Sequence, residues 1–184
     1  RKIGRSLEVT LGFPVRPIVK RHIIEKLPPS LKVSFKPDLA GADILIIGPG
    51  EAREILGFIE DFPEIRSIHV VDTTEAVFRF IEYGLKKKFD QKGDLKVKIY
   101  GYRTSALELP EELISGMDIV FDAMVFDERQ FSTEQLKQAA RQIYEVLKPR
   151  GLHISAGFLR MPYHLYGFKR SDSQHLTWVN DKGE

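Results

Sequence analysis

Two glycines after a strongly apolar run are the residues whose type and spacing most directly suggest ligand binding. Gly48 and Gly50 follow the stretch "DILII" and stand immediately before a helical pattern. Glycines at a strand-to-helix turn let the backbone approach a ligand closely, and the free N–H groups at the start of a helix favour an electron-rich group. A tight bend without a ligand has the same pattern, so the glycines alone leave both interpretations open.

Two aspartates stand near the ends of other apolar runs. Asp72 closes "SIHVVD", and Asp122 lies near the end of "DIVFDA". At Asp72, a strand-end carboxylate can accept hydrogen bonds from two neighbouring hydroxyl groups, whereas Asp122 can orient a substrate amine. Asp72 can equally cap a following helix together with Thr73 and Thr74, and Asp122 can be a satisfied polar strand end. Both residues therefore keep a structural alternative.

Several kinds of chemistry are excluded or disfavoured. The dinucleotide fingerprint requires Gly or Ala where Arg53 stands, and no Gly-Lys-Ser/Thr of a Walker loop follows. A nucleotide-dependent oxidoreductase is therefore a disfavoured hypothesis. No cluster of residues has metal-ligand spacing, and the absence of cysteine excludes thiolate zinc sites, disulfides and a Cys nucleophile.

The composition is that of an ordinary globular domain. The chain has 184 residues, 42% of them hydrophobic, and a formal net charge of +2. Such a chain can bury a substantial core, and this charge does not indicate a nucleic-acid partner. The absence of cysteine suits a reducing compartment, so we expect a cytoplasmic protein. No apolar run approaches the about 18 residues of a membrane span, so no membrane partner is expected.

The elements that must position these residues alternate along the chain. β-branched runs predict strands, and apolar stripes at helical spacing predict helices. The expected strands are 43–48, 67–72, 96–100, 118–123 and 152–157, and the expected helices are 51–60, 74–89, 110–115 and 133–148. Ser132 and Gln135 have the spacing of a capping box at the last of these helices. Beyond the fifth strand, two strands at 162–169 and 174–179 are expected to form an antiparallel hairpin.

This alternation predicts one compact α/β domain. We expect a doubly wound, mostly parallel seven-stranded sheet with helices on both faces and a C-terminal antiparallel hairpin. Residues 1–40 are predicted to form an N-terminal helical extension or cap, with a helix at 16–26, and residues 41–184 the Rossmann-like domain. The polar strand ends would then lie along one edge of the sheet, where open α/β folds bind ligands.

The ordered set of motifs resembles the class I S-adenosylmethionine-dependent methyltransferases over about residues 42–180. "ILIIGPGEA" stands where that family has its glycine-rich first motif, and "HVVDTT" where it has the acidic end of the second strand. "YRTSALELP" is similar to the segment that borders adenine, and "MDIVFDAMVF" to the fourth strand with its leading Asp118. "YEVLKPRGLHISA" matches the helix, turn and fifth strand, and its "LKPRGL" is the most specific single piece.

The resemblance implies S-adenosylmethionine as cofactor, S-adenosylhomocysteine as product and an unidentified small-molecule or protein acceptor. It implies that the turn holds the methionine part, the second strand end the ribose, and the next segment the adenine. The implied cofactor residues are Gly48, Pro49, Gly50, Glu51, Asp72, Thr73, Ser105, Ala106, Leu107, Asp122 and Ala123.

Three positions depart from the family pattern. Ile46 stands where the family has an acidic residue, Ser105 replaces an aspartate at the adenine, and Ala52 replaces a third glycine. A catalytically inactive relative that acts as a protein-interaction module is therefore the alternative hypothesis, and a ligand cleft filled at Gly48 would favour it.

No catalytic residue is assigned from the sequence, because methyl transfer from a sulfonium depends mainly on positioning. His164, near Tyr163 and Tyr166, is a candidate base at the expected cleft mouth. His69 and His153 lie within expected strands and are interpreted as core or sheet-face residues.

Overall fold

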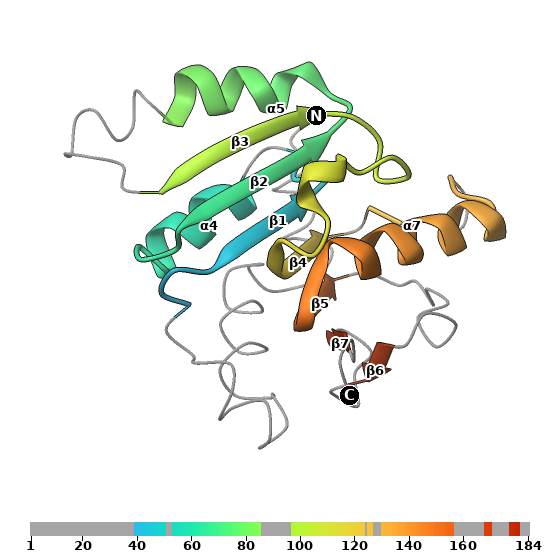
Figure 1. Ribbon diagram of the computed structural model, residues 1–184. Coiled ribbons are helices and arrows are strands. Elements are labelled where there is room, and N and C mark those ends of the chain that lie inside the picture. Colours follow the sequence, from blue (N-terminus) through green and yellow to red (C-terminus); the bar gives the residue numbers. More distant parts are fainter. Residues whose placement is uncertain are drawn as a thin grey trace.

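The computed structural model describes residues 39–50, 53–85, 97–123, 125–126, 130–156, 168–170 and 177–180. Its strands form one sheet in the order β3-β2-β1-β4-β5-β7-β6 (Figure 1). Five strands are parallel: β1 (Asp43–Ile47), β2 (Ser67–Asp72), β3 (Lys98–Arg103), β4 (Met117–Ala123) and β5 (Leu147–Ala156). The short β7 (Thr177–Asn180) lies antiparallel beside β5, and β6 (Phe168–Arg170) lies antiparallel beside β7.

Helices cover both faces of the sheet. One core joins Ile44 and Ile46 of β1 to α4 (Arg53–Asp61) and α5 (Glu75–Arg79), which continues into a π-helix, η1 (Phe80–Leu85). The other core joins Leu45 and Ile47 to α7 (Thr133–Val146) and to a 3₁₀ turn, η2 (Glu111–Leu113), and Figure 1 shows α7 on the face away from α4. The predicted α/β fold, with a mostly parallel sheet between helices, is confirmed.

The helix α7 begins as its sequence predicts. The Ser132 hydroxyl accepts a hydrogen bond from Gln135 N–H, and the Gln135 side chain accepts one from Ser132 N–H, which completes the capping box. At its other end α7 passes into β5 without a loop, because Leu147 already pairs with Met117 of β4.

The "LKPRG" turn is a bulge within β5. Between Leu147 and Leu152 the partner strand advances only from Met117 to Ile119. Arg150 takes a left-handed φ of 62°. A side chain on Gly151 would lie 2.9 Å from the Leu147 side chain and 3.0 Å from the Lys148 carbonyl oxygen, so glycine is required there.

Several predicted bounds were wrong. The third strand is Lys98–Arg103 rather than 96–100, and it includes Gly101, where a side chain would lie 2.8 Å from the Phe78 ring, so glycine leaves room for that ring. The expected helix 74–89 is α-helical only to Arg79, and residues 86–89 lie outside the described part. The expected helix 110–115 is only the three-residue η2. Of the last two expected strands the structure describes Phe168–Arg170 and Thr177–Asn180, and the expected starts at 162–167 and 174–176 lie outside the described residues.

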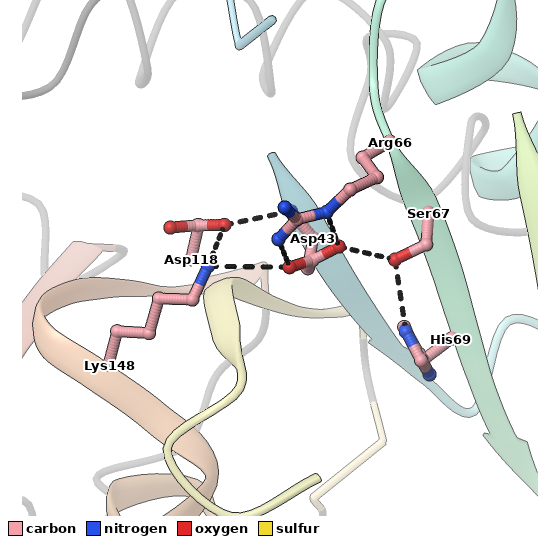
Figure 2. Close-up of polar contacts among 6 residues, drawn as sticks. All are labelled: Asp43, Arg66, Ser67, His69, Asp118 and Lys148. Atoms are coloured by element: carbon pink, nitrogen blue, oxygen red, sulfur yellow. Dashed lines mark hydrogen bonds and ion pairs between the residues drawn. The ribbon is translucent and has the colours of Figure 1, made fainter. Parts of the chain in front are cut away.

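A polar network joins the amino ends of the parallel strands, at the edge opposite the glycine turn (Figure 2). Asp43 at the start of β1 is paired with Arg66 and accepts a hydrogen bond of 2.6 Å from the Ser67 hydroxyl. Lys148 of the β5 bulge binds Asp118 of β4 at 2.7 Å and Asp43 at 3.3 Å. Burial alone would raise the pKa of Asp43, but these hydrogen bonds and cations outweigh it and lower that pKa to about 2.

His69 extends this network along β2. Its Nε2 lies 3.0 Å from Ser67 Oγ and its Nδ1 lies 3.1 Å from the Tyr102 hydroxyl, while its ring stacks on Tyr100 at 4.8 Å. Burial lowers the pKa of His69, although the charges of Asp43 and Glu112 oppose this. The network therefore fixes the register of β1, β2, β4 and β5 where the strands begin.

The predicted N-terminal extension, including the helix at 16–26, lies outside the described residues except for its last two positions, 39 and 40. Leu39 is buried against the first core, so the described chain enters the domain just before β1.

Candidate functional site

The glycine turn follows β1 at the carboxyl edge of the sheet. Gly48 and Gly50 both take left-handed φ values, 60° and 56°, which glycine adopts without strain. Gly48 N–H donates to the carbonyl oxygen of Val71 (2.8 Å), so the turn lies against the end of β2. The space along the missing Gly48 side chain is taken by Val125, whose Cγ2 would lie 2.6 Å from a Cβ at that position.

Asp72 ends β2 directly beside this turn. Its Oδ1 accepts a hydrogen bond from Thr74 N–H at 2.7 Å, in front of the first turn of α5. This bond is not the predicted helix N-cap, because the N-cap residue of α5 is Thr74, which has no side-chain cap hydrogen bond, and Asp72 binds the N–H of Thr74 itself in the turn before the helix. This contact uses one carboxylate oxygen, and Thr73 beside it is exposed.

The segment after β3 is fixed by its own turns and by α7. Ser105 Oγ accepts a hydrogen bond from Leu107 N–H (3.2 Å), and Ala106 is buried against the second core. Gln138 of α7 donates to the Leu107 carbonyl oxygen (2.8 Å), and Gln142, one turn later, accepts from Leu109 N–H (2.7 Å). Two glutamines thus hold the expected adenine-side segment.

Asp122 lies inside the sheet with only 1% of its surface exposed. Its Oδ2 is 2.7 Å from Nε2 of the fully buried His153, and its Oδ1 accepts from the Ser155 hydroxyl at 3.0 Å. Both oxygens therefore bind groups of β5. These two bonds join the carboxyl ends of β4 and β5, and they also offset the desolvation of a carboxylate buried inside the sheet.

The structure thus brings Gly48, Pro49, Gly50, Asp72 and Ser105–Leu107 to one edge of the sheet, while Asp122 faces β5. Glu51, Ala52 and the candidate base His164 lie outside the described residues, as do Tyr163 and Tyr166; of Ala123 only the backbone is described.

Four contacts were not predicted from the sequence. They involve Val125 at the glycine turn, Gln138 and Gln142 at the segment after β3, and His153 beside Asp122. The i, i+4 spacing of the two glutamines beside the apolar stripe of α7 was the only available signal.

Within the part of the chain that the structure describes, no three His, Asp or Glu side chains gather so as to hold a metal ion. None of the helices in that part is long and apolar enough to cross a membrane.

No family model and no curated protein matches the sequence. Solved structures do match the fold. The antibiotic-resistance methyltransferase Kmr aligns with 83% of this chain and 93% of its own, at a TM-score of 0.61 and 16% identity. The aminoglycoside resistance methyltransferase NpmB1 aligns with 81% and 93%, at 0.61 and 12% identity. A 16S rRNA (adenine(1408)-N(1))-methyltransferase W203A mutant from Catenulisporales acidiphilia aligns with 86% and 94%, at 0.61 and 14% identity.

These likenesses define the class of fold. The chain has the class I methyltransferase fold, as the order of its motifs indicated. Because the sequence identities are only 12–16%, these comparisons establish a shared fold and do not extend to a shared substrate.

Proposed function

We propose that the chain transfers a methyl group from S-adenosylmethionine to an unidentified acceptor and releases S-adenosylhomocysteine. The hydrogen bond from Gly48 N–H to the Val71 carbonyl oxygen supports this most directly, because it brings the glycine turn beside the strand end that carries Asp72. Ligands of open α/β sheets bind at this carboxyl edge. The fold shared with the named methyltransferases supports the same proposal.

In this proposal each part of the cofactor has a suitable group in the chain. The turn of residues 48–51 holds the methionine part through the backbone N–H groups that follow Pro49, because Gly48 N–H already donates to the Val71 carbonyl oxygen and proline has no N–H. Val125 takes the space along the missing Gly48 side chain, and its side chain has to yield to a ligand that approaches from there. Asp72 accepts hydrogen bonds from the ribose hydroxyls with the carboxylate oxygen that Thr74 does not use, and Thr73 lies beside it. Ser105, Ala106 and Leu107 border the adenine, held in place by Gln138.

The residues at the end of β4 have a positioning role. The bonds of Asp122 to His153 and Ser155 keep β4 and β5 together beneath the reacting groups, and Ala123 follows at the strand end. The bound cofactor supplies an electrophilic methyl group on a sulfonium. Since its displacement is in line, alignment of donor and acceptor by a rigid edge can supply much of the rate enhancement.

Calorimetric titration with S-adenosylhomocysteine tests the proposal, with NADH as the comparison ligand. We expect micromolar binding of S-adenosylhomocysteine. Asp72→Asn should weaken it by about 1 kcal/mol or more, the scale of a lost hydrogen bond to a charged group. Asn retains an oxygen for Thr74 N–H, so this variant separates ligand recognition from turn stability, whereas Asp72→Ala removes both.

Glu75→Gln, an exposed change three residues away, is the matched control and should bind as the unchanged protein does. Weakening by Asp72→Ala alone would assign Asp72 to the turn rather than to the ligand. No binding of S-adenosylhomocysteine by the folded, unchanged protein would contradict the enzyme proposal and favour a protein-interaction role.

A further inference from the structure

Gly48 is fixed as glycine by the protein itself. Its φ of 60° disfavours other residues, and a Cβ there would lie 2.6 Å from Val125 Cγ2 and 3.4 Å from Val125 Cγ1. Real Cβ atoms essentially never come within 3.0 Å of another side chain. Along the direction of the missing Gly48 side chain, Val125 therefore leaves no room for a methyl group unless its own side chain shifts.

Val125 reaches the turn from the segment that follows β4. The next residue, Phe126, is 4% exposed and packs its ring against Phe131 with centroids 5.7 Å apart. Val125 itself is only half-buried and lies at the margin of the second core. Its backbone position is thus anchored by Phe126, while its side chain extends to Gly48.

This placement has a consequence for any ligand at the turn. Glycine at a strand-to-helix turn normally gives a ligand access to the backbone. Along the direction of the missing Gly48 side chain, that access is taken by a valine methyl group. A ligand that contacts Gly48 from this side requires the Val125 side chain to rotate away or to be smaller.

We propose that Val125 sets the clearance over the glycine turn of the cofactor site and so the affinity for the methionine part of the ligand. The inference rests on the proposed function. Shortening Val125 should improve binding, because the energy needed to displace its side chain no longer opposes the ligand. Lengthening it should weaken binding.

The first test needs no ligand and measures the Gly48–Val125 contact. Gly48→Ala introduces left-handed strain and a clash with Val125, whereas Gly41→Ala introduces the strain alone, since nothing lies within 4 Å of a Cβ at Gly41, where φ is 73°. The strain alone should raise the unfolding equilibrium constant about five- to thirtyfold. In the unchanged protein, Gly48→Ala should raise the unfolding equilibrium constant at least about fivefold more than Gly41→Ala does. In the Val125→Ala background, measured relative to Val125→Ala itself, Gly48→Ala should raise it no more than Gly41→Ala does. Equal effects of Gly48→Ala in both backgrounds would overturn the contact and the inference.

The second test titrates S-adenosylhomocysteine into the unchanged protein, Val125→Ala and Val125→Leu. We expect Val125→Ala to lower the Kd about fivefold or more and Val125→Leu to raise it. Ile114→Ala, which shortens an exposed side chain elsewhere, should leave the Kd unchanged. Binding by the unchanged protein that Val125→Ala leaves equal or weakens would overturn the inference while the proposed function stands. Binding by none of the proteins, with the stability coupling intact, would overturn the proposed function and this inference with it.

Discussion

Asp43 is the side chain to which most of the polar partners at the amino edge of the sheet bind. It accepts from Ser67, pairs with Arg66 and lies 3.3 Å from Lys148, all with 7% of its own surface exposed. Asp43→Asn removes the charge that these donors require. We expect it to lower the free energy of unfolding at pH 7 by about 1–3 kcal/mol, measured by urea denaturation.

The pKa of Asp43 also gives this side chain a pH window. Its folded value of about 2 lies below the ordinary value of 3.8, so its contribution is complete above about pH 4 and is lost as the pH falls toward 2. The loss of stability across this window should be shallower in Asp43→Asn. Glu75→Gln, which removes the charge that forms exposed pairs with Arg79 and Arg103, should change stability by less than about 0.5 kcal/mol. An equal effect of both variants would contradict the role of Asp43.

His69 is a base whereas Asp43 is an acid, but in both cases the folded state lowers the pKa of the side chain, so stability falls as the pH drops. Burial lowers its folded pKa below the ordinary 6.5, so the folded protein favours the neutral imidazole. Stability is then complete above pH 6.5 and falls as the pH drops from there toward the folded pKa, because the unfolded chain binds the proton more readily. His69→Gln should flatten the profile of unfolding free energy below pH 6.5, because the glutamine amide does not titrate. Parallel profiles would show that His69 does not titrate in this range.

At the scale of elements, α7 holds the segment after β3 through two glutamine side chains, in addition to the apolar packing of Ala106 and Leu109 in the second core. Gln142 accepts from Leu109 N–H, and Leu109 is buried, so Gln142→Ala leaves that N–H without its acceptor. We expect hydrogen exchange at the Leu109 amide to accelerate about five- to thirtyfold, equivalent to 1–2 kcal/mol.

Lys137→Ala is the matched control for this change. Lys137 lies on the same helix and pairs with Glu134 at the surface, so its removal should leave exchange at Leu109 unaltered. Faster exchange in both variants would indicate general loosening of α7 instead of a local clamp.

At the scale of the whole molecule, Phe121 links the central sheet to the helix layer. It is fully buried in β4, and its ring meets that of Phe58 in α4 edge-on, with centroids 5.6 Å apart. Phe121→Ala should cost about 3–5 kcal/mol, a large share of the about 5–15 kcal/mol that stabilises a typical domain. Phe121→Leu, which fills most of the volume of the ring, should cost about 1 kcal/mol of unfolding free energy. Urea denaturation measures both changes, and similar unfolding midpoints for the two variants would contradict this packing.

The sequence predicted the parts of the fold that depend on local patterns. The runs around Ile44–Ile47 and Val70–Val71 identified β1 and β2 within one residue, and the capping box located the start of α7. The third strand was predicted too early, because the apolar-polar run "KVKIY" stops before Gly101, whereas the strand continues through Gly101 to Arg103. The glycine at that place leaves room for the Phe78 ring, a tertiary contact that no local pattern shows. The change to a π-helix at Phe80 has no periodic signal.

Part of the candidate site could likewise be predicted from local patterns, and part of it could not. Gly48 and Asp72 were recognisable because they end apolar runs, and parallel strands bring such ends to one edge. The inward turn of Asp122 toward His153, and the approach of Val125 to Gly48, join segments that are far apart in the sequence. Such contacts depend on tertiary packing, which no local pattern encodes.

The place of β1 in the sheet order has a consequence for synthesis of the chain. Its two neighbours are β2 and β4, so the second edge of β1 is paired only after residues up to 123 have left the ribosome. Until then "ILII" exposes unpaired backbone groups and four uncharged aliphatic side chains, a combination that favours association between nascent chains. The strand that ends at the glycine turn is therefore open to association with other nascent chains until β4 has been synthesised.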